Sequence, residues 1–202
     1  GVSFGAENTN DGGAINVNLG NQPMPYADGY TFSAWIKLFA GDEVAGRQTQ
    51  WDSIFTATKD ENKDPMQGAS HTGITIHRGN VWGSWKKMVV TFQVGASSAL
   101  QNGADWYNTS ESGDQGELPW AHLTLTINRE GSTPVLLYRD GEVTPFTSTV
   151  FNKENIPDLK TCTQYHKFGN RGVGAGAGIR GTMRDIRIYD RALSKSEIRE
   201  IY

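Results

Sequence analysis

The sequence of 202 residues predicts an all-β fold, a two-sheet antiparallel jelly-roll sandwich that ends in one short C-terminal helix. Many short segments alternate apolar and polar residues, and Gly, Asn, Asp and Ser cluster between those segments. The last nine residues, 194–202, change to a helical pattern instead. Because no linker and no internal repeat divides the sequence, we expect a single domain over residues 1–202.

The clearest strand covers residues 30–39, YTFSAWIKLF. Its apolar residues at every second position share one face, as the two-residue period of a strand requires: Phe32, Ala34, Ile36 and Leu38. Trp35 falls on the opposite face, so both faces of this strand are expected to be partly covered.

Further strands are expected where the same alternation recurs: 51–59, 71–79, 88–95, 119–130, two strands within 133–143, 164–169 and 179–189. Asp140 and Gly141 separate the paired strands, and this dipeptide is typical of a tight type I′ hairpin turn. Loops are expected where turn residues cluster: 5–13, 40–50, 59–70, 95–117 and 170–178.

The C-terminal helix has its own start signal. Ser194 and Glu197 have the spacing of a capping box, and Leu193 and Ile198 have that of a hydrophobic staple. A helix this short is not stable alone, so we expect it to dock on the neighbouring sheet.

Three motifs resemble the laminin-G-like jelly rolls of the concanavalin A-like lectin and glucanase superfamily. They are YTFSAWIKL, WAHLTLTINREGSTPVLLYRDGEV and GIRGTMRDIRIYDRALSKSEIREIY, in that order along the sequence. The resemblance implies two antiparallel sheets of six or seven strands. It also implies that Trp35 and Trp120, in matched strands, belong to the core and that His122 has a structural role. Such domains serve as lectin-like carbohydrate-binding modules, adhesion domains and surface decorations, so the resemblance leaves the function open.

Charge and hydropathy exclude some partners. The net charge of −3 is too balanced to indicate a nucleic-acid partner, and no apolar run is long enough to insert into a membrane. The start of the sequence has no signal-peptide pattern, which favours a mature or excised domain of a larger chain or assembly. The single cysteine, Cys162, permits no internal disulfide bond, which fits a bacterial secreted protein as well as a cytosolic one.

Catalytic patterns are missing from the sequence. The hydrolases of the superfamily carry a Glu-x-Asp-x-x-Glu strand, and no strand here has it, so we expect no enzymatic activity. Cys162 is four residues from His166, but this spacing alone does not make a nucleophile, and an inert buried thiol is the expected state. A glycoside hydrolase or polysaccharide lyase is kept as a weaker alternative.

Calcium is the one cofactor that the sequence suggests. Asp60, Asn62 and Asp64 supply oxygen ligands at alternate positions, as a calcium loop does. By resemblance, a second calcium site would join Asp11 of the N-terminal loop to Asp185 of the last strand. Arg184 stands where the family usually has an acidic residue, which counts against that second site.

Candidate ligand-binding residues are aromatic side chains in polar loops, because a sugar ring stacks on an aromatic ring. We expect stacking on Trp82, Trp85, Trp106 and Tyr107, with Asp105, Asn108 and His77 as polar partners. The alternative for each ring is that it fixes its loop to the core.

The sequence thus favours a non-catalytic, extracellular or cell-surface recognition domain that binds carbohydrate or a glycosylated surface. A structural, adhesion or protein-interaction module of a larger surface protein or particle is the alternative.

Overall fold

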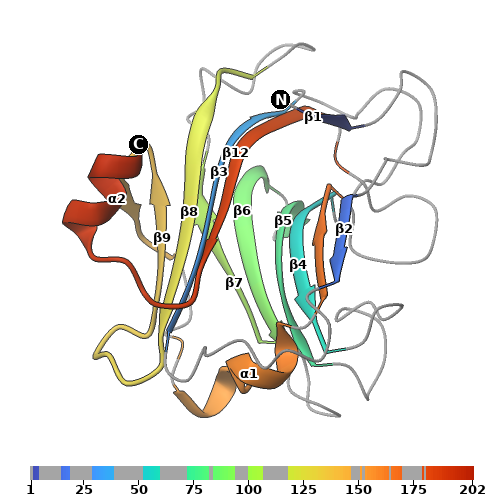
Figure 1. The fold of residues 1–202 in the computed structure, drawn as a ribbon. Helices are drawn as coiled ribbons and strands as arrows, with labels where there is room; N and C mark the ends of the chain where they lie inside the picture. The colour runs from blue at the N-terminus through green and yellow to red at the C-terminus, as the bar shows by residue number, and fades with distance from the viewer. Residues whose placement is uncertain are drawn as a thin grey trace.

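The computed structural model describes twelve strands, two short α-helices and one 3₁₀ helix. The described residues are 2–4, 15–18, 29–38, 52–59, 72–81, 84–93, 100–106, 118–146, 151, 153–163, 165–169, 179 and 181–202. They form two antiparallel sheets of six strands each, packed face to face (Figure 1). The predicted all-β, two-sheet fold is therefore confirmed.

Sheet 1 contains both chain ends of the fold. Its strand order is β1 (Val2–Phe4), β12 (Gly181–Tyr189), β3 (Gly29–Leu38), β8 (Ala121–Asn128), β9 (Val135–Arg139) and β10 (Glu142–Thr144). Sheet 2 is built from the middle of the chain. Its strand order is β2 (Ile15–Asn18), β11 (Tyr165–Phe168), β4 (Asp52–Thr58), β5 (Gly73–Val81), β6 (Ser84–Gln93) and β7 (Leu100–Asp105).

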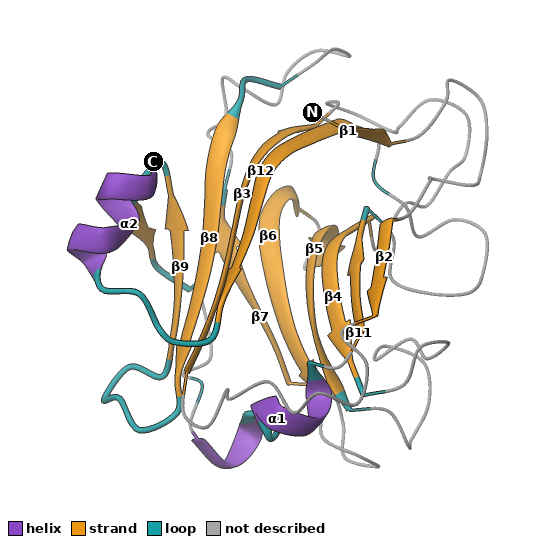
Figure 2. Ribbon diagram, viewed as in Figure 1, coloured by secondary structure: helices purple, strands orange, loops and turns teal. Residues whose placement is uncertain are grey.

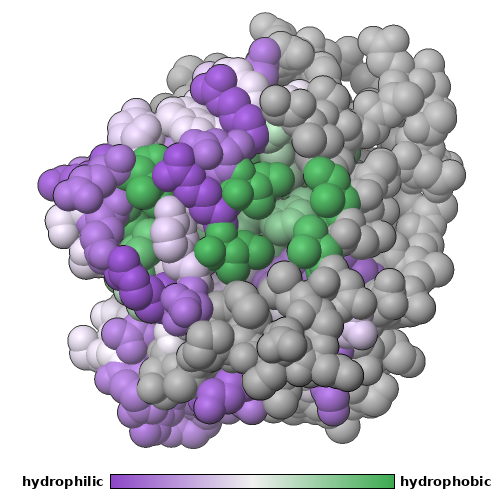
Figure 3. All heavy atoms as spheres, in the orientation of Figure 1, coloured by the Kyte–Doolittle hydropathy of each residue, from purple (hydrophilic) through white to green (hydrophobic). Residues whose placement is uncertain are grey.

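The core lies between the two sheets, as the sequence alternation predicts. On β3 and β8, Phe32 pairs with Leu125 and Ala34 with Leu123, and all four side chains are fully buried. Phe32 meets Phe55 of sheet 2 with 4.3 Å between the ring centroids, so aromatic contacts join the sheets. Apolar side chains show in the middle of the face in Figure 3, between the two sheets, whereas helix α2 is mostly polar on its surface.

The Asp140–Gly141 hairpin forms as predicted. Asp140 has a φ of 53° and Gly141 a φ of 77°, and positive φ at both central residues defines a type I′ turn. Glu142 then pairs with Arg139 and starts β10.

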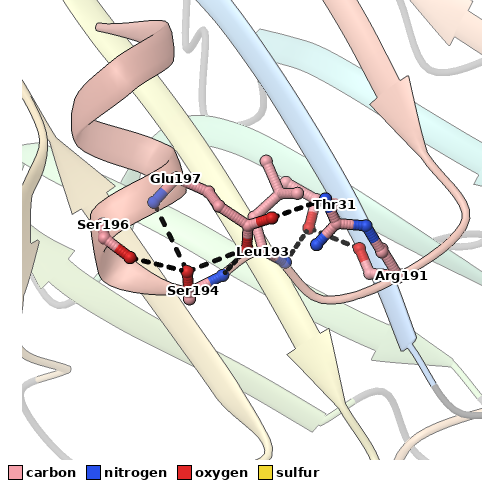
Figure 4. Close-up of polar contacts among 6 residues, drawn as sticks. All are labelled: Thr31, Arg191, Leu193, Ser194, Ser196 and Glu197. Carbon is pink, nitrogen blue, oxygen red and sulfur yellow. Dashed lines mark hydrogen bonds and ion pairs between the residues drawn. The ribbon is translucent and has the colours of Figure 1, made fainter.

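Helix α2 (Lys195–Ile201) lies on the outer face of sheet 1, away from sheet 2 (Figure 2). Its capping box is present: Ser194 N donates to Glu197 Oε2 at 2.8 Å, and Glu197 N donates to Ser194 Oγ at 3.4 Å (Figure 4). Ile198 and Leu193 are buried against Tyr138 of β9. The predicted docking of this helix on the sheet is confirmed.

Thr31 of β3 fixes the segment that leads into α2. Its hydroxyl donates to the carbonyl of Arg191 at 2.8 Å and accepts from the amide of Leu193 at 3.0 Å (Figure 4). The chain passes so close to the sheet here that a Cβ on Gly29 would lie 2.6 Å from the amide nitrogen of Ala192. Two side-chain hydrogen bonds and one glycine thus set the path of the chain over the sheet.

Several elements differ from the sequence prediction. Strand β7 lies inside the segment expected as a loop over 95–117, and β1 and β2 were not predicted at all. All three are edge strands of three to six residues, which is too short for their own pattern to identify them.

Two short helical segments, η1 (Lys153–Asn155) and α1 (Leu159–Cys162), were also missed. Asp158 caps α1 by accepting from the amide of Lys160 at 3.1 Å, and α1 lies at one end of the sandwich (Figure 2). Leu159 and Cys162 are fully buried, which explains why these four residues fold onto the core.

Among the described residues, no helix is both long enough and apolar enough to span a bilayer.

Candidate functional site

The candidate binding residues of the sequence fall on the strands of sheet 2 and on the segments that follow them. Trp85 belongs to β6 and Asp105 ends β7, and the register pairs Lys87 with Asp105, so their backbones lie at one end of this sheet. The side chains of Trp85 and Asp105 are not among the described atoms, and the remaining candidates lie outside the described residues: Trp82, Tyr107 and Asn108.

Trp106 is not available as a stacking surface, contrary to the prediction. Its side chain is only 1% exposed and belongs to the core cluster between the sheets. The guanidinium of Arg139 lies 5.8 Å from the ring centroid and also donates to the Trp106 carbonyl. The alternative role, in which the ring fixes its segment to the core, is the one observed.

His77 is also not available as a polar partner for a ligand. It lies on the outer face of β5, between Ser53 of β4 and Val89 of β6, and it is fully buried. The outer face of sheet 2 is therefore covered at this position, a property that alternation along one strand does not reveal.

The same face of sheet 2 carries a row of buried threonines. Thr56, Thr75 and Thr91 lie side by side in register on β4, β5 and β6, and each is at most 1% exposed. Their hydroxyl groups have no hydrogen-bond partner in the described part of the chain. At these three positions the face is polar, but a ligand in solution cannot reach the hydroxyl groups.

The predicted calcium ligands are only partly described. Asp11, Asp60, Asn62 and Asp64 lie outside the described residues. Asp185 accepts two hydrogen bonds from Arg187, at 3.1 and 2.7 Å, so both of its carboxylate oxygens already have a cationic partner. Within the described residues, no group of three His, Cys, Asp or Glu side chains is placed to hold a metal ion.

The nucleophile candidates are inert in this fold. Cys162 is fully buried in α1, and burial raises the pKa of its thiol, which keeps the reactive thiolate form rare. His166 accepts or donates a hydrogen bond of 3.1 Å with the Tyr30 hydroxyl in the core, and burial lowers the pKa of His166 to about 4. A neutral imidazole in this position stabilises the core and does no chemistry on a ligand.

An accessible aromatic cluster occurs instead on the outer face of sheet 1. Trp35 and Trp120 are both partly exposed, contrary to the prediction that they belong to the core. Arg184 of β12 is exposed and lies over both indoles, with its guanidinium carbon 5.4 Å from the Trp35 centroid and 4.4 Å from the Trp120 centroid. Tyr202, which is 53% exposed, stacks on Trp35 with 5.5 Å between centroids. We call these four residues the aromatic–arginine patch: Trp35, Trp120, Arg184 and Tyr202.

Sheet register assembles the patch. Arg184 pairs with Trp35 across β12 and β3, and Trp35 pairs with His122 across β3 and β8. His122 supports the underside of the patch: its Nε2 lies 3.0 Å from the Ser33 hydroxyl, and its ring centroid lies 5.3 Å from that of Trp35. His122 is buried and contacts Ser33 and Trp35, so its role is structural, as the resemblance implied. Burial also lowers the pKa of its imidazole.

A β-bulge on β12 places two arginines on this outer face. The register shifts between Arg184 and Arg187, which pair with Trp35 and Ser33, and Asp185 in the bulge has a φ of 54°. The bulge adds one residue to β12, so two arginines three positions apart point to the same side of the sheet. Sequence reasoning missed the patch. Two signals in the sequence could have indicated the patch. Trp35 falls on the face of its strand opposite the core residues, and Arg184 stands where the family usually has an acidic residue.

Two comparisons with known proteins identify the fold. A family model, Laminin_G_3, described as the concanavalin A-like lectin/glucanases superfamily, matches residues 11–199. No curated protein sequence matches the chain.

Solved structures with the same fold include three binding domains of botulinum neurotoxins. The receptor binding domain of the C/D mosaic serotype shares 19% identity with a TM-score of 0.61, and the match covers 96% of this chain and 40% of that one. The serotype G binding domain shares 13% identity with a TM-score of 0.61, covering 93% and 39%. The serotype DC binding domain in complex with SialylT shares 15% identity with a TM-score of 0.61, covering 98% and 41%. The chain thus spans about two fifths of the length of these domains, and at such identities the likeness concerns the fold.

Proposed function

Because the chain belongs to the concanavalin A-like lectin/glucanases superfamily, we propose that it is a non-catalytic recognition domain that binds carbohydrate or a glycosylated surface. The observation that carries the proposal is the aromatic–arginine patch on the outer face of sheet 1. Partly exposed indoles combined with a polar group are the chemistry by which a protein surface holds a hydroxyl-rich ring.

The patch is suited to stacking because Trp35, at its centre, is held in place. Trp35 contacts His122 and Tyr202 as well as Arg184, at centroid distances of 5.3 and 5.5 Å for the two rings. A side chain that is already fixed loses little conformational entropy when a ligand binds. The patch therefore resembles a preformed binding surface more than a mobile loop.

The structural neighbours support recognition as the general role. They are receptor-binding or binding domains, and one is in complex with SialylT while another is in complex with rat synaptotagmin II. Those ligands belong to chains about two and a half times as long, so the saccharide partner and an extracellular or cell-surface location are proposals for this chain.

Catalysis is not part of the proposal, because the sequence has no paired-carboxylate strand and its one cysteine is buried. Calcium is retained as a proposed accessory ion for the segment with Asp60, Asn62 and Asp64. Asp185 is no longer proposed as a calcium ligand, because Arg187 occupies its carboxylate.

A glycan array probed with and without calcium tests the proposal. We expect binding to a subset of glycans, and Trp120→Ala is expected to reduce it roughly ten-fold through the lost stacking surface. The double variant Trp82→Ala with Trp85→Ala serves as the matched comparison, because those residues are the alternative site. A larger loss in the double variant would move the site to the end of sheet 2.

Absence of any glycan binding, in both buffers, would reject carbohydrate recognition and favour the protein-interaction alternative. Release of reducing ends from a bound glycan would instead show that the domain is an enzyme.

A further inference from the structure

Arg184 contacts the two indoles in a way that leaves its hydrogen-bonding groups available. A guanidinium is planar, and it stacks on aromatic rings through its face while its N–H donors point outward in the plane. The guanidinium carbon of Arg184 lies over both rings, at 4.4 and 5.4 Å from their centroids, and the side chain is exposed. Within the described residues the N–H groups of Arg184 form no hydrogen bond or ion pair, so these donors are available to a ligand.

The charge of Arg184 is also not neutralised by its neighbours. Asp185, the adjacent residue, gives both carboxylate oxygens to Arg187, at 3.1 and 2.7 Å. No other carboxylate in the described part of the chain forms an ion pair with Arg184. Arg184 thus has a different environment from Arg187, although the bulge places both on the same face.

Other charged groups at this end of the sheet are already paired. Asp140 accepts from the amide of His122 at 2.8 Å and lies 3.5 Å from Arg139, and Glu142 forms ion pairs with Lys195 and Arg199 of the α2 segment. Arg184 has no ion-pair partner within the described residues, and it lies over two aromatic rings.

We propose that Arg184 makes the patch selective for saccharides that carry an anionic group, a carboxylate or a sulfate ester. This inference rests on the proposed carbohydrate function and assigns its ligand class. A carboxylate or sulfate accepts two parallel hydrogen bonds from the outward edge of the guanidinium, and the attached sugar ring lies against Trp120. Trp35 is already stacked by Tyr202, whereas the only ring contact of Trp120 within the described residues is with Arg184.

Titrations with three lactose probes test the inference: 3′-sialyllactose with a carboxylate, 3′-sulfated lactose with a sulfate ester, and neutral lactose. We expect at least one charged probe to bind at least ten-fold more tightly than lactose, by ligand-observed NMR or calorimetry. Its affinity should fall as sodium chloride is raised, because salt screens an exposed charge pair. The ratio of the affinities for the two charged probes shows whether the patch prefers a carboxylate or a sulfate ester.

Variants of Arg184 separate charge from geometry. Arg184→Gln should lower the affinity for the charged probe about ten- to a hundred-fold, which is the range for a lost hydrogen bond to a charged group. The affinity for lactose should stay unchanged. Arg184→Lys keeps the charge but loses the planar fork, so an intermediate loss is expected. Lys160→Gln, on α1 at the end of the sandwich, makes the same change in net charge and should have no effect.

The outcomes distinguish the two proposals. Equal affinity for charged and neutral probes, or an unchanged preference in Arg184→Gln, overturns the assignment to Arg184 while carbohydrate binding stands. No binding of any probe overturns both. Circular dichroism and thermal unfolding of each variant show that the fold is retained.

Discussion

Buried histidines make this molecule sensitive to acid. Burial lowers the pKa of His166 to about 4, below its ordinary value near 6.5. Between these values the unfolded chain binds a proton that the folded chain does not, so the free energy of unfolding falls as the pH falls through this window. His122 also has a lowered pKa and acts in the same direction.

We therefore expect His166→Gln to lose part of this pH dependence. Glutamine can still form a hydrogen bond with the Tyr30 hydroxyl but does not titrate. Between pH 7 and pH 4.5, the wild-type protein should lose about 2 kcal/mol more of its free energy of unfolding than the variant loses. Urea unfolding at both pH values measures this difference, and equal losses in the two proteins would contradict it.

The buried threonines of sheet 2 predict an unusual gain in stability. Thr75 has a fully buried hydroxyl without a partner among the described residues, so Thr75→Val removes a desolvated polar group and keeps the side-chain shape. We expect the free energy of unfolding to rise by about 1 kcal/mol.

Thr163→Val is the matched control, because the Thr163 hydroxyl is equally buried but donates to the Leu159 carbonyl at 2.6 Å. This variant should lose about 1 kcal/mol in chemical denaturation. If Thr75→Val were destabilised to the same degree, the Thr75 hydroxyl would have a partner in the native protein.

For single residues, the sequence predicted the chemical state of a side chain better than its exposure to solvent. It identified the inert, buried state of Cys162 correctly. It exchanged the roles of two tryptophans, however: Trp106 is in the core and Trp35 is partly exposed. Exposure depends on which other segments cover a face, and the pattern of a single strand does not contain that information.

Among the elements, the helix α2 was the most predictable, because its signals are local. The cap, the box and the staple all lie within residues 193–198, so they act regardless of the rest of the fold. The edge strands β1, β2 and β7 are at the other extreme, since each is a strand only because a neighbour pairs with it.

The attachment of α2 to the sheet is expected to depend on Thr31. Thr31→Val removes one hydrogen bond to the Arg191 carbonyl and leaves the buried amide of Leu193 without an acceptor. We expect the free energy of unfolding to fall by about 2 kcal/mol. Amide hydrogen exchange at Leu193 should also become faster.

Thr31→Ser is the corresponding control, because serine keeps the hydroxyl that makes both hydrogen bonds. Its stability and its exchange at Leu193 should stay close to those of the wild type. A loss as large as that of the valine variant would assign the effect to the missing methyl group instead.

At the scale of the whole molecule, folding depends more on the order of the strands in the sheets than on any single contact. Strand β12 lies between β1 and β3, so sheet 1 is complete only when the C-terminal part of the chain has been placed between two N-terminal strands (Figure 1). Contacts between such distant segments close large loops and make folding both cooperative and slow.

A chain that ends after residue 180 is therefore expected to lose cooperative unfolding, because β1 and β3 lose their shared partner. A chain that ends after Leu193 keeps β12 and lacks only α2, so it should unfold cooperatively at a lower denaturant concentration. Urea titrations followed by tryptophan fluorescence compare the two. A cooperative transition in the shorter chain would show that β12 is not required for the fold.

The aromatic–arginine patch could not be predicted from the sequence. Trp35, Trp120 and Arg184 are up to 149 positions apart in the sequence, and only the β12–β3–β8 register brings them together. The resemblance to a known family predicted the two sheets correctly but gave no information about this patch, because Arg184 departs from the usual family residue.

The contact between Tyr202 and Trp35 has a practical consequence for how the protein is handled. Any polypeptide joined after Tyr202, whether a neighbouring domain or a purification tag, leaves the molecule directly beside the aromatic–arginine patch. Immobilising the protein through its C-terminus would press this face against the sensor surface and hide it from a ligand. A tag before β1 has the same drawback, because Val2 pairs with Met183, the neighbour of Arg184. Attachment through an exposed side chain at one end of the sandwich, such as Lys160 of α1, leaves the patch open to a ligand.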